Sequence, residues 1–201
     1  MRTLELNPSE LNAKDVYMLL TGSVVPRPIA WVSTLSEDGV LNLAPFSFFT
    51  VASTKPTILA ISIGPGTGER QGTEKETLVN IRSQKEFVIN VVSSSLGNEM
   101  QKSAENVPSE VDEFEQAGLT PVNSMTVKPK RVKEASIHME CKLHQIIPLG
   151  SNALVLGEMT HYHINDDTYL GDYKVDLEKL SPLGRLAGNY SESKEFFTLP
   201  R

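Results

Sequence analysis

One stretch near residue 140 alternates strictly between apolar and polar side chains. Its odd positions are apolar and its even positions polar: Ile137, Met139, Cys141 and Leu143 against His138, Glu140, Lys142 and His144. A period of two residues is that of a strand with one face on a core, as occurs in antiparallel sheets. The pattern therefore predicts a half-buried β-strand here, with residues 153–164 as its partner and residues 148–152 as the turn.

The first third of the chain predicts several further strands. Pro26-Arg27-Pro28 holds an extended segment, because proline restricts both itself and the residue before it. Residues 29–35 then indicate a strand, Glu37-Asp38-Gly39 a hairpin turn, and residues 41–52 and 57–63 further strands. The expected fold class is mainly β, an antiparallel barrel or sandwich with a few peripheral helices.

Two helices are expected between these strands and the alternating one. Thr73-Glu-Lys-Glu76 has the spacing of a capping box, in which a threonine hydroxyl and a glutamate carboxylate satisfy each other's backbone amides. Leu78 and Ile81 then continue an apolar stripe. Leu96, Met100 and Ala104 recur every four residues, which predicts a second amphipathic helix. The apolar run 87–92 between the helices suits a buried strand.

Charge and length limit the classes of function. A formal charge of −6 and a pI of about 5.3 argue against nucleic-acid binding, which needs a basic face. The most apolar window, residues 17–35, is interrupted by Pro26 and Pro28 and predicts no membrane span. The first residues lack the apolar core of a signal peptide, so a cytoplasmic location is expected. Residues 1–201 fit a single domain.

The histidines and the cysteine predict no metal site. His138 and His144 are three residues either side of Cys141, and strand geometry points the cysteine away from both. His161 and His163 share a strand face, but two ligands without a third are weak evidence for zinc. A structural or pocket-lining role is the simpler interpretation. Cys141 lies on the apolar face, where a thiol packs as a small hydrophobe.

A glycine-containing loop precedes the first of these helices. Gly66, Gly68 and Gly72 match neither a dinucleotide fingerprint nor a P-loop. A helix N-terminus nevertheless attracts anions, and Arg70, Lys75 and Thr77 lie around this one. A phosphate site is one interpretation, which Glu74 and Glu76 would oppose unless they point away; a flexible connection is the other.

Residues 42–50 mix hydroxyl and amide side chains with aromatic ones in an expected strand. Pro45 predicts a sheet edge or a break, because proline is excluded from central strands. A broken strand exposes backbone groups that a planar heteroaromatic ligand could use. The alternative is an aromatic core with satisfied polar neighbours.

Five segments of the chain form a set that is specific in its order and spacing. They are Gly22-Ser-Val-Val-Pro-Arg-Pro-Ile-Ala-Trp-Val-Ser-Thr34, Asn42-x-Ala-Pro-Phe-Ser47-x-Phe, Lys75-Glu-Thr77-x-x-Asn80-Ile81, Gly157-Glu-x-x-x-x-His163 and Pro182-Leu-Gly-Arg-Leu-x-Gly-Asn-Tyr190. With these segments the chain resembles, from Gly22 to Tyr190, the flavin reductase-like, FMN-binding split-barrel proteins, which include flavoredoxin.

The resemblance implies a Greek-key split β-barrel that forms a homodimer, with FMN near the subunit interface. It implies that Val32, Ser33 and Thr34, together with Lys75 and Thr77, hold the phosphate. The stretch from Asn42 to Ser47 would follow the ribityl chain and the ring. The full set of cofactor-binding residues expected on this basis is Arg27, Trp31, Val32, Ser33, Thr34, Asn42, Ala44, Pro45, Phe46, Ser47, Arg70, Lys75, Thr77, Asn80 and His163. The family usually has aspartate where this chain has Glu76.

The expected activity is that of an NAD(P)H:flavin oxidoreductase. NADH or NADPH would reduce FMN, which is either held or exchanged as a substrate. Hydride transfer to a flavin needs no side-chain acid or base, so no catalytic residue is assigned. Two alternatives stay open: a flavoredoxin-type electron carrier reduced by a redox protein partner, and a non-catalytic flavin- or haem-binding module. His163 and Arg185 are candidates for the open side of the pocket.

Overall fold

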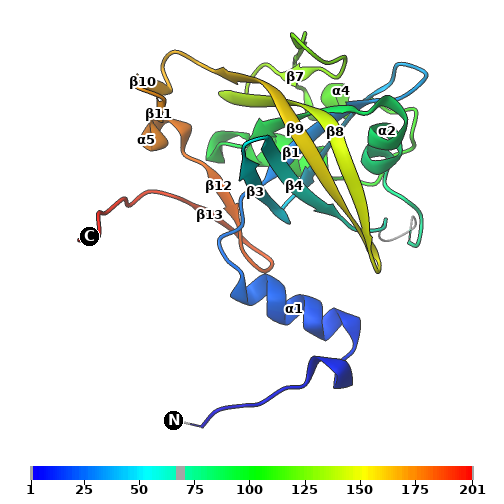
Figure 1. Ribbon diagram of the computed structural model, residues 1–201, viewed down its shortest axis with the longest axis vertical. Helices are drawn as coiled ribbons and strands as arrows, with labels where there is room; N and C mark the ends of the chain where they lie inside the picture. Colours follow the sequence, from blue (N-terminus) through cyan, green and yellow to red (C-terminus); the bar gives the residue numbers. More distant parts are fainter. Residues whose placement is uncertain (1, 67–70, 201) are drawn as a thin grey trace.

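A single antiparallel sheet of seven strands forms the body of the molecule. The computed structural model describes residues 2–66 and 71–200 (Figure 1). The strand order is β2-β1-β5-β8-β9-β4-β3. Their bounds are β1 Ala30–Leu35, β2 Leu41–Phe46, β3 Phe49–Thr54, β4 Thr57–Ile63, β5 Glu86–Val91, β8 Ile137–Leu149 and β9 Asn152–Ile164. Strands hold 38% of the residues and helices 21%, so the prediction of a mainly β fold is confirmed.

The two hairpins expected from sequence are present. β1 and β2 pair antiparallel from Ala30↔Phe46 to Leu35↔Leu41, and Gly39 in their turn has a φ of +84°. β8 and β9 pair along almost their whole length. Residues 41–52 were expected as one strand but form two, β2 and β3, separated at residues 47–48. β2 lies at one end of the sheet, as Pro45 predicted.

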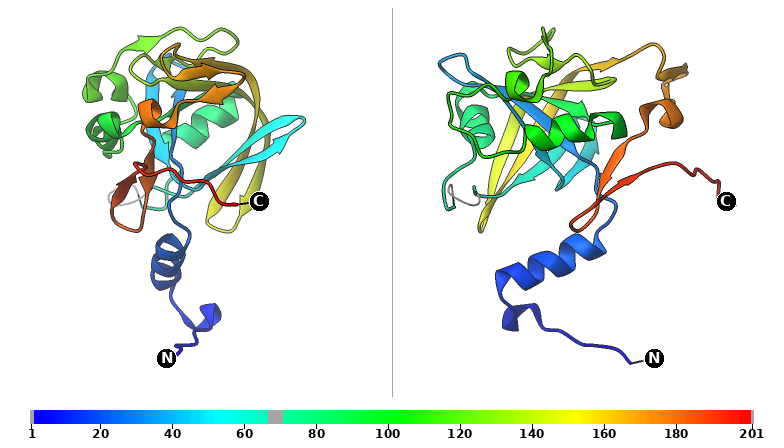
Figure 2. Two further views of the ribbon diagram at one scale, coloured as in Figure 1. Left: turned by 90° about the vertical axis from the view of Figure 1, so that its left-hand side faces the viewer. Right: turned by 180° about the vertical axis from the view of Figure 1, so that it is seen from behind.

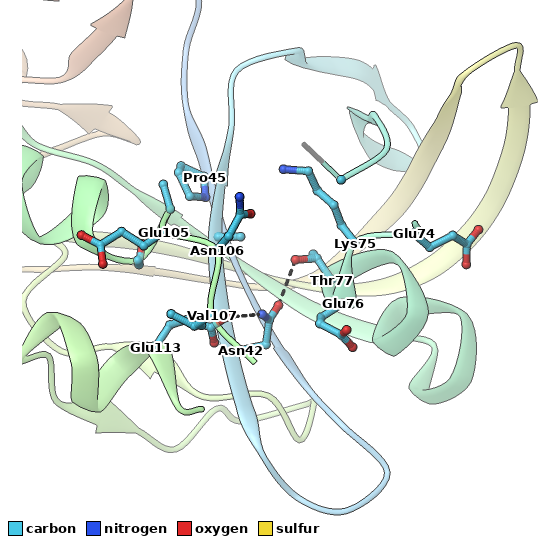
Figure 3. A pocket seen from close by; sticks show the side chains of 14 residues that line it. Asn42, Pro45, Glu74, Lys75, Glu76, Thr77, Glu105, Asn106, Val107 and Glu113 are labelled. Carbon is cyan, nitrogen blue, oxygen red and sulfur yellow. Dashed lines mark hydrogen bonds between the residues drawn. The ribbon is translucent and has the colours of Figure 1, made fainter. Parts of the chain in front are cut away.

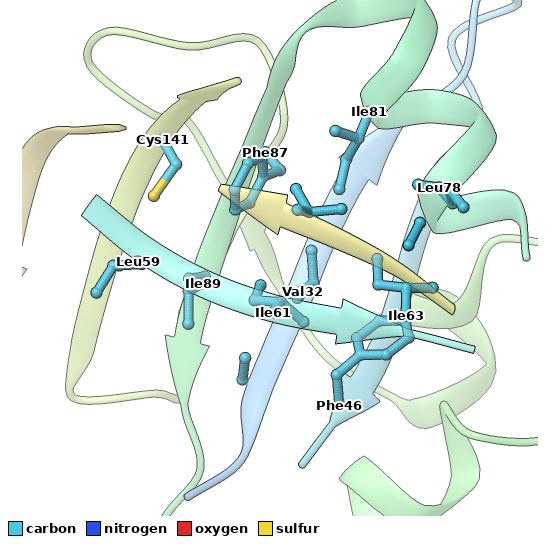
Figure 4. Packing of buried hydrophobic residues seen from close by; sticks show 13 residues of the cluster. Val32, Phe46, Leu59, Ile61, Ile63, Leu78, Ile81, Phe87, Ile89 and Cys141 are labelled. Carbon is cyan, nitrogen blue, oxygen red and sulfur yellow. The ribbon is translucent and has the colours of Figure 1, made fainter. Parts of the chain in front are cut away.

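The sheet curls around an apolar core, which Figure 4 shows. The cluster takes side chains from β1, β2, β4, β5, β8, β9 and the helix α2, with Phe87, Ile61 and Ile89 fully buried at its centre. Cys141 faces this core, and burial raises the pKa of its thiol. Met139 and Leu143 pack against the same core, so these odd positions of β8 turn inward as predicted, but His138 and Glu140 on the polar face are also buried rather than exposed.

A second apolar cluster covers the other face of β1 and β2. Trp31 and Leu43 are fully buried in it, against Met100 and Phe114 from the segment that follows β5. Because consecutive residues of a strand face opposite ways, Val32 packs in the first core and Trp31 in the second. β1 is thus buried on both faces, which places its hydroxyl residues inside the protein.

Gly157 on β9 is required by close packing. A Cβ atom there would lie 2.3 Å from Phe87 Cζ and 3.2 Å from Cys141 Cβ. Any larger side chain would have to displace the Phe87 ring from the core. This glycine of the motif that ends at His163 therefore has a structural role.

Helices surround the sheet and connect its strands. They are α1 Ala13–Ser23, α2 Glu76–Gln84, α3 Gly97–Lys102, α4 Glu113–Ala117, α5 Leu177–Leu180 and the 3-10 turns η1 Pro8–Glu10 and η3 Ser94–Leu96. The expected capping box is wrong: α2 has Lys75 as its N-cap, with no side-chain hydrogen bond capping it. The second expected helix is present but short, and Ala104 lies beyond its end. No helix among the described residues could span a membrane.

The remaining strands are short and lie at the periphery. They are β6 Pro121–Val122, β7 Arg131–Val132, β10 Tyr169–Gly171, β11 Lys174–Val175, β12 Leu183–Arg185 and β13 Tyr190–Glu192, and they pair two by two. Figures 1 and 2 show α1 projecting away from the barrel in all three views, and the last residues leave the barrel in Figure 1 and in the right-hand view of Figure 2. Both ends of the chain therefore form arms rather than parts of the core.

Candidate functional site

A small hollow lies where β2, the start of α2 and the segment after α3 meet (Figure 3). Asn42, Ala44 and Pro45 line it from β2, and Lys75 and Thr77 line it from α2. Its cavity volume is about 80 Å³. That is room for a phosphate-sized group and far below the roughly 300–1,000 Å³ of a pocket that encloses a whole organic ligand.

The start of α2 makes this hollow suitable for an anion. Lys75 is the N-cap of α2, and its ammonium lies 5.5 Å from the centre of the Phe46 ring. Thr77 is in the first turn, where amide groups have no acceptor within the helix and the helix dipole is positive. Figure 3 shows the Glu74 side chain turned away from the hollow, and Glu74 forms an ion pair with Arg82.

Asn42 is the centre of a buried hydrogen-bond network beneath the hollow. Its Oδ1 accepts hydrogen bonds from Thr77 Oγ1 at 2.9 Å and Thr34 Oγ1 at 3.0 Å. Its Nδ2 donates to Glu113 Oε1 at 2.8 Å, and the amide of Leu43 donates to Glu113 Oε2 at 3.2 Å. The network joins β1, β2, α2 and α4, so it holds the lining of the hollow in place.

Glu113 is the most unusual acid of this region. Burial raises its pKa to about 7, while hydrogen bonds from its own helix, Leu43 and Asn42 favour the ionised form and Asp112 disfavours it. Nothing in the sequence around residue 113 indicated a site residue. It lies 71 positions from Asn42, and only folding places the two side chains together.

A second hollow of about 200 Å³ continues from the first along β2. The two share Pro45 and Ala104 in their linings. Beyond these, Ser47, Arg185 and Tyr190 line the second hollow, with the Arg185 guanidinium 4.4 Å from the centre of the Tyr190 ring. The two hollows together offer a phosphate-sized end and a wider end with aromatic and cationic side chains.

Comparison with known proteins shows which family the chain belongs to. The family model described as "Flavin reductase like domain" matches residues 21–181. This chain belongs to the flavin reductase-like family. An uncharacterized protein of Aquifex aeolicus is 42% identical to this flavin reductase-like chain, over 93% of it and 94% of the relative.

Two solved structures resemble this flavin reductase-like protein along nearly its whole length. Nitrilotriacetate monooxygenase component B from Bacillus cereus has a TM-score of 0.93 and 36% identity, covering 99% of this chain and 100% of its own. Pseudomonas fluorescens 2-nitrobenzoate 2-nitroreductase has a TM-score of 0.88 and 29% identity, covering 98% and 96%. The split-barrel fold is confirmed, and the family supports a flavin cofactor and oxidoreductase activity.

The residues expected at the cofactor fall into three groups in this flavin reductase-like fold. Asn42, Ala44, Pro45, Lys75 and Thr77 surround the first hollow, and Ser47 lines the second. Thr34 and Asn80 lie behind the first hollow, where Asn80 Nδ2 donates to Thr34 Oγ1 at 3.1 Å. Trp31, Val32 and Phe46 pack in the two cores. Arg70 lies outside the described residues.

Ser33 and Arg27 are held by the protein itself. Ser33 Oγ donates to the carbonyl of Lys130 at 2.6 Å and accepts from Asn90 Nδ2. The buried Arg27 guanidinium donates to the carbonyls of Thr21, Val24 and Leu186, at 2.6, 2.9 and 2.7 Å. Its Nε lies 3.4 Å from Ser47 Oγ, at the edge of the second hollow. In this arrangement Arg27 supports the site from behind.

His163 belongs to a separate polar cluster on the outer side of β8 and β9. Its Nε2 lies 2.6 Å from Glu140 Oε1, and its ring centre is 4.6 Å from that of His161. Hydrogen bonds from Thr126, Met125 and His163 overcome burial and lower the pKa of Glu140 to about 2. Burial lowers the pKa of His163, although Glu140 opposes this. The cluster fixes residues 125–126 to β8. Among the described residues, no group of three or more His, Cys, Asp or Glu side chains could hold a metal ion.

Sequence reasoning missed Glu113 and Ser103. Ser103 Oγ accepts a hydrogen bond from Trp31 Nε1 at 2.8 Å, and Ser103 also lines the first hollow. Trp31 therefore positions the wall of the site through Ser103. Neither residue lies in a motif, so no local pattern could have identified it.

Proposed function

We propose that this protein binds FMN non-covalently and passes electrons from NADH or NADPH through it, as a homodimer. The observation that carries the proposal is the small hollow at the start of α2, with Lys75 and Thr77 on one side. A dianionic phosphate needs a cation and donor groups, and the start of α2 offers the Lys75 ammonium and the backbone amides of its first turn. The residues present therefore fit the phosphate end of the cofactor.

The rest of the cofactor would follow β2 out of the first hollow. Ala44 and Pro45 form an apolar step between the two hollows, and Ser47 lies at the far end. Pro45 has no backbone N–H group, so Pro45 itself would contact a ligand only through its ring and carbonyl. FMN, when bound, supplies the hydride and single-electron chemistry, and the protein supplies position and electrostatics.

The wider hollow is our proposed place for the electron donor. Arg185 offers a cation and Tyr190 an aromatic ring, which suits a planar and anionic molecule such as a nicotinamide nucleotide. The hydroxyl of Tyr190 donates to Gln101 Oε1 at 2.9 Å, which fixes the ring against α3. A donor held there would lie next to a flavin ring placed along β2.

The homodimer is supported by the apolar surface of the N-terminal arm. Tyr17 and Leu20 on α1 and Val24 just after its end lie on one face and are 58%, 54% and 60% exposed. Met18 and Leu19 are also about half exposed. Contiguous apolar surface of this kind marks interaction sites. A second copy is the occupant we propose, because the arm carries this surface away from its own barrel (Figure 2).

An acceptor protein is part of the same proposal. The Bacillus cereus relative is a component of a monooxygenase. By analogy, reduced flavin formed here would be passed to a partner redox protein. The Pseudomonas fluorescens relative is a nitroreductase, so direct reduction of a nitroaromatic compound is the competing acceptor reaction to test.

The visible spectrum under anaerobic conditions tests the proposal. The purified protein, with FMN added if none copurifies, should show flavin bands that NADH or NADPH bleaches and that oxygen restores. Bands that respond to dithionite and not to either nicotinamide would replace the reductase with an electron carrier that needs a protein donor. No FMN binding would contradict the proposal and leave a haem-binding or non-catalytic module of the same fold.

A further inference from the structure

Glu113 lies at the end of a chain of hydrogen bonds that reaches the anion-sized hollow. Its carboxylate accepts from Asn42 Nδ2, and Asn42 Oδ1 accepts from the Thr77 hydroxyl. Glu113 and Asn42 are 8% exposed and Thr77 is 1% exposed, and all three line the hollow. A change at Glu113 therefore acts on an anion in the hollow directly, through its charge, and also through Asn42.

This arrangement occupies the hydroxyl proton of Thr77. A threonine hydroxyl has one proton, and here that proton is used in the bond to Asn42 Oδ1. Thr77 then presents only lone pairs of its hydroxyl to the hollow, which repel an anion. An ionised Glu113 enforces this orientation, because a carboxylate needs the Asn42 NH₂ group to face it.

A protonated Glu113 carboxyl can donate a hydrogen bond, so it favours the Asn42 carbonyl oxygen, rather than the NH₂ group, as its neighbour. The protonated carboxyl would donate to Asn42 Oδ1 once the amide has turned over, and it would still accept from the amide of Leu43. Asn42 Nδ2, with two protons, would then donate to the hydroxyl oxygens of Thr34 and Thr77. The Thr77 proton is released from this bond and can point into the hollow. In this second arrangement the fully buried Thr34 hydroxyl, which also accepts from Asn80 Nδ2, loses Asn42 Oδ1 as its acceptor, and an anion bound at Thr77 must offset that cost.

The surroundings favour proton uptake by Glu113. Burial raises its pKa to about 7, so both states are accessible near neutral pH. Carboxylates also outnumber cations on the elements around it: Asp112 and Glu115 on α4, Glu110 before it, Glu105 after α3, Glu99 and Lys102 on α3, and Lys75 and Glu76 at the start of α2. An anion in the hollow would add a further negative charge.

We propose that Glu113 is a positioning residue whose protonation turns over the Asn42 amide and makes the Thr77 hydroxyl a donor to an anion in the hollow. This inference rests on the proposed function, because the anion is taken to be the FMN phosphate. Binding of FMN would then draw one proton from solvent onto Glu113. Binding of riboflavin, which lacks the phosphate, would draw none.

Proton uptake on binding determines how FMN affinity changes with pH. A ligand that binds with uptake of one proton loses up to about tenfold in affinity for each pH unit above the pKa of the free group. FMN affinity should therefore fall from pH 7 to pH 9. Ionisation of the phosphate itself works the other way, because its second pKa is about 6 and the dianion binds a cationic site better.

Calorimetric titration in two buffers of different ionisation enthalpy measures the protons taken up. At pH 8, FMN binding should take up close to one proton in the natural protein and close to none in Glu113→Gln. The glutamine amide would donate to Asn42 Oδ1 as the protonated acid does, so FMN affinity in this variant should vary less than about threefold from pH 7 to pH 9. Glu115→Gln, the same charge change on the exposed side of α4, should behave as the natural protein does.

Equal proton uptake in Glu113→Gln and the natural protein, or none in either, would overturn the inference. The side-chain amide resonances of Asn42 provide a test without flavin. They should shift with a midpoint near pH 7 in the natural protein, and a spectrum constant from pH 5.5 to pH 8.5 would also overturn it. Failure of all three proteins to bind FMN would contradict the proposed cofactor, and the Asn42 resonances would then decide the relay alone.

Discussion

Some polar side chains of this protein serve ligand binding in the hollow, and others serve the stability of the fold. Lys75 extends along the hollow and carries a charge that an anion could use (Figure 3). His138 lies away from the hollow and is only 3% exposed. Its Nε2 lies 2.7 Å from the carbonyl oxygen of Val132. Substitution at the first should alter ligand binding, and substitution at the second should alter stability.

Lys75→Met should weaken FMN binding by about 10- to 100-fold, because it removes the cation that faces the phosphate. Riboflavin affinity should stay the same, since riboflavin has no phosphate. Fluorescence titration with both flavins measures the difference. Lys85→Met, at the opposite end of α2, is the matched control and should change neither affinity. Equal losses for FMN and riboflavin would place the phosphate elsewhere.

His138 should make the protein less stable in mild acid. Burial lowers its pKa to about 4, and its Nδ1 has no hydrogen-bond partner among the described residues. In the unfolded chain His138 therefore takes up a proton near pH 6.5, whereas in the folded protein it takes one up only near pH 4. The free energy of unfolding should fall as the pH drops through this window, by an amount on the order of 3 kcal/mol.

Urea unfolding at pH 7 and pH 4.5 measures this pH dependence. His138→Gln keeps an N–H donor for Val132 and removes the titrating group, so its stability should change less between the two pH values. His144→Gln, on the exposed part of the same strand, should follow the natural protein. An unaltered pH dependence in His138→Gln would assign the acid sensitivity to another group.

Elements at the two ends of the chain are joined by one residue. Arg27 precedes β1, and its guanidinium donates to carbonyls at the end of α1 and in the β12–β13 turn. Its backbone also pairs with Arg185, which lines the second hollow. A single side chain therefore holds the N-terminal helix and the C-terminal hairpin beside the proposed donor site.

Arg27→Met should lower the free energy of unfolding by about 2–4 kcal/mol, because it leaves buried carbonyls without donors. Hydrogen exchange should become faster in α1 and in β12 while the barrel strands stay protected. Arg82→Met removes an exposed ion pair with Glu74 and should cost less than about 1 kcal/mol. Unchanged exchange in α1 would show that other contacts hold the helix.

At the scale of the whole molecule, the barrel is well packed and the arms are not. The two apolar clusters fill both sides of β1 and β2. By contrast, α1 and the C-terminal residues Phe196 and Phe197 expose large apolar side chains outside the barrel. The proposed homodimer would bury the surface of α1.

Leu20→Glu should therefore shift the protein from dimer to monomer, with a dissociation constant raised roughly tenfold or more. Leu20 is half exposed in one chain, so the fold should tolerate the charge. Light scattering across a concentration series measures the mass. Tyr173→Glu introduces the same charge at a fully exposed aromatic residue on the β10–β11 turn and should leave the mass unchanged. A monomeric natural protein would contradict the homodimer.

Local patterns in the sequence determined the strands, their faces and most of their turns. Alternation from Ile137 to Leu143 placed Cys141 inward, and Pro45 marked the edge strand, because these effects depend on neighbouring residues only. The start of α2 was misplaced at Thr73, since a capping motif competes with the surrounding loop for the same residues. The order of motifs also indicated Lys75 and Thr77 as site residues.

Only the tertiary structure decided which polar side chains lie together and which are buried. The contact of Glu113 with Asn42, the support of Ser103 by Trp31 and the separation of His163 from the hollow all join or divide segments distant in sequence. The raised pKa of Glu113 has the same origin, because desolvation depends on what covers a group. Burial and long-range contact are properties of the folded chain, and no local pattern records them.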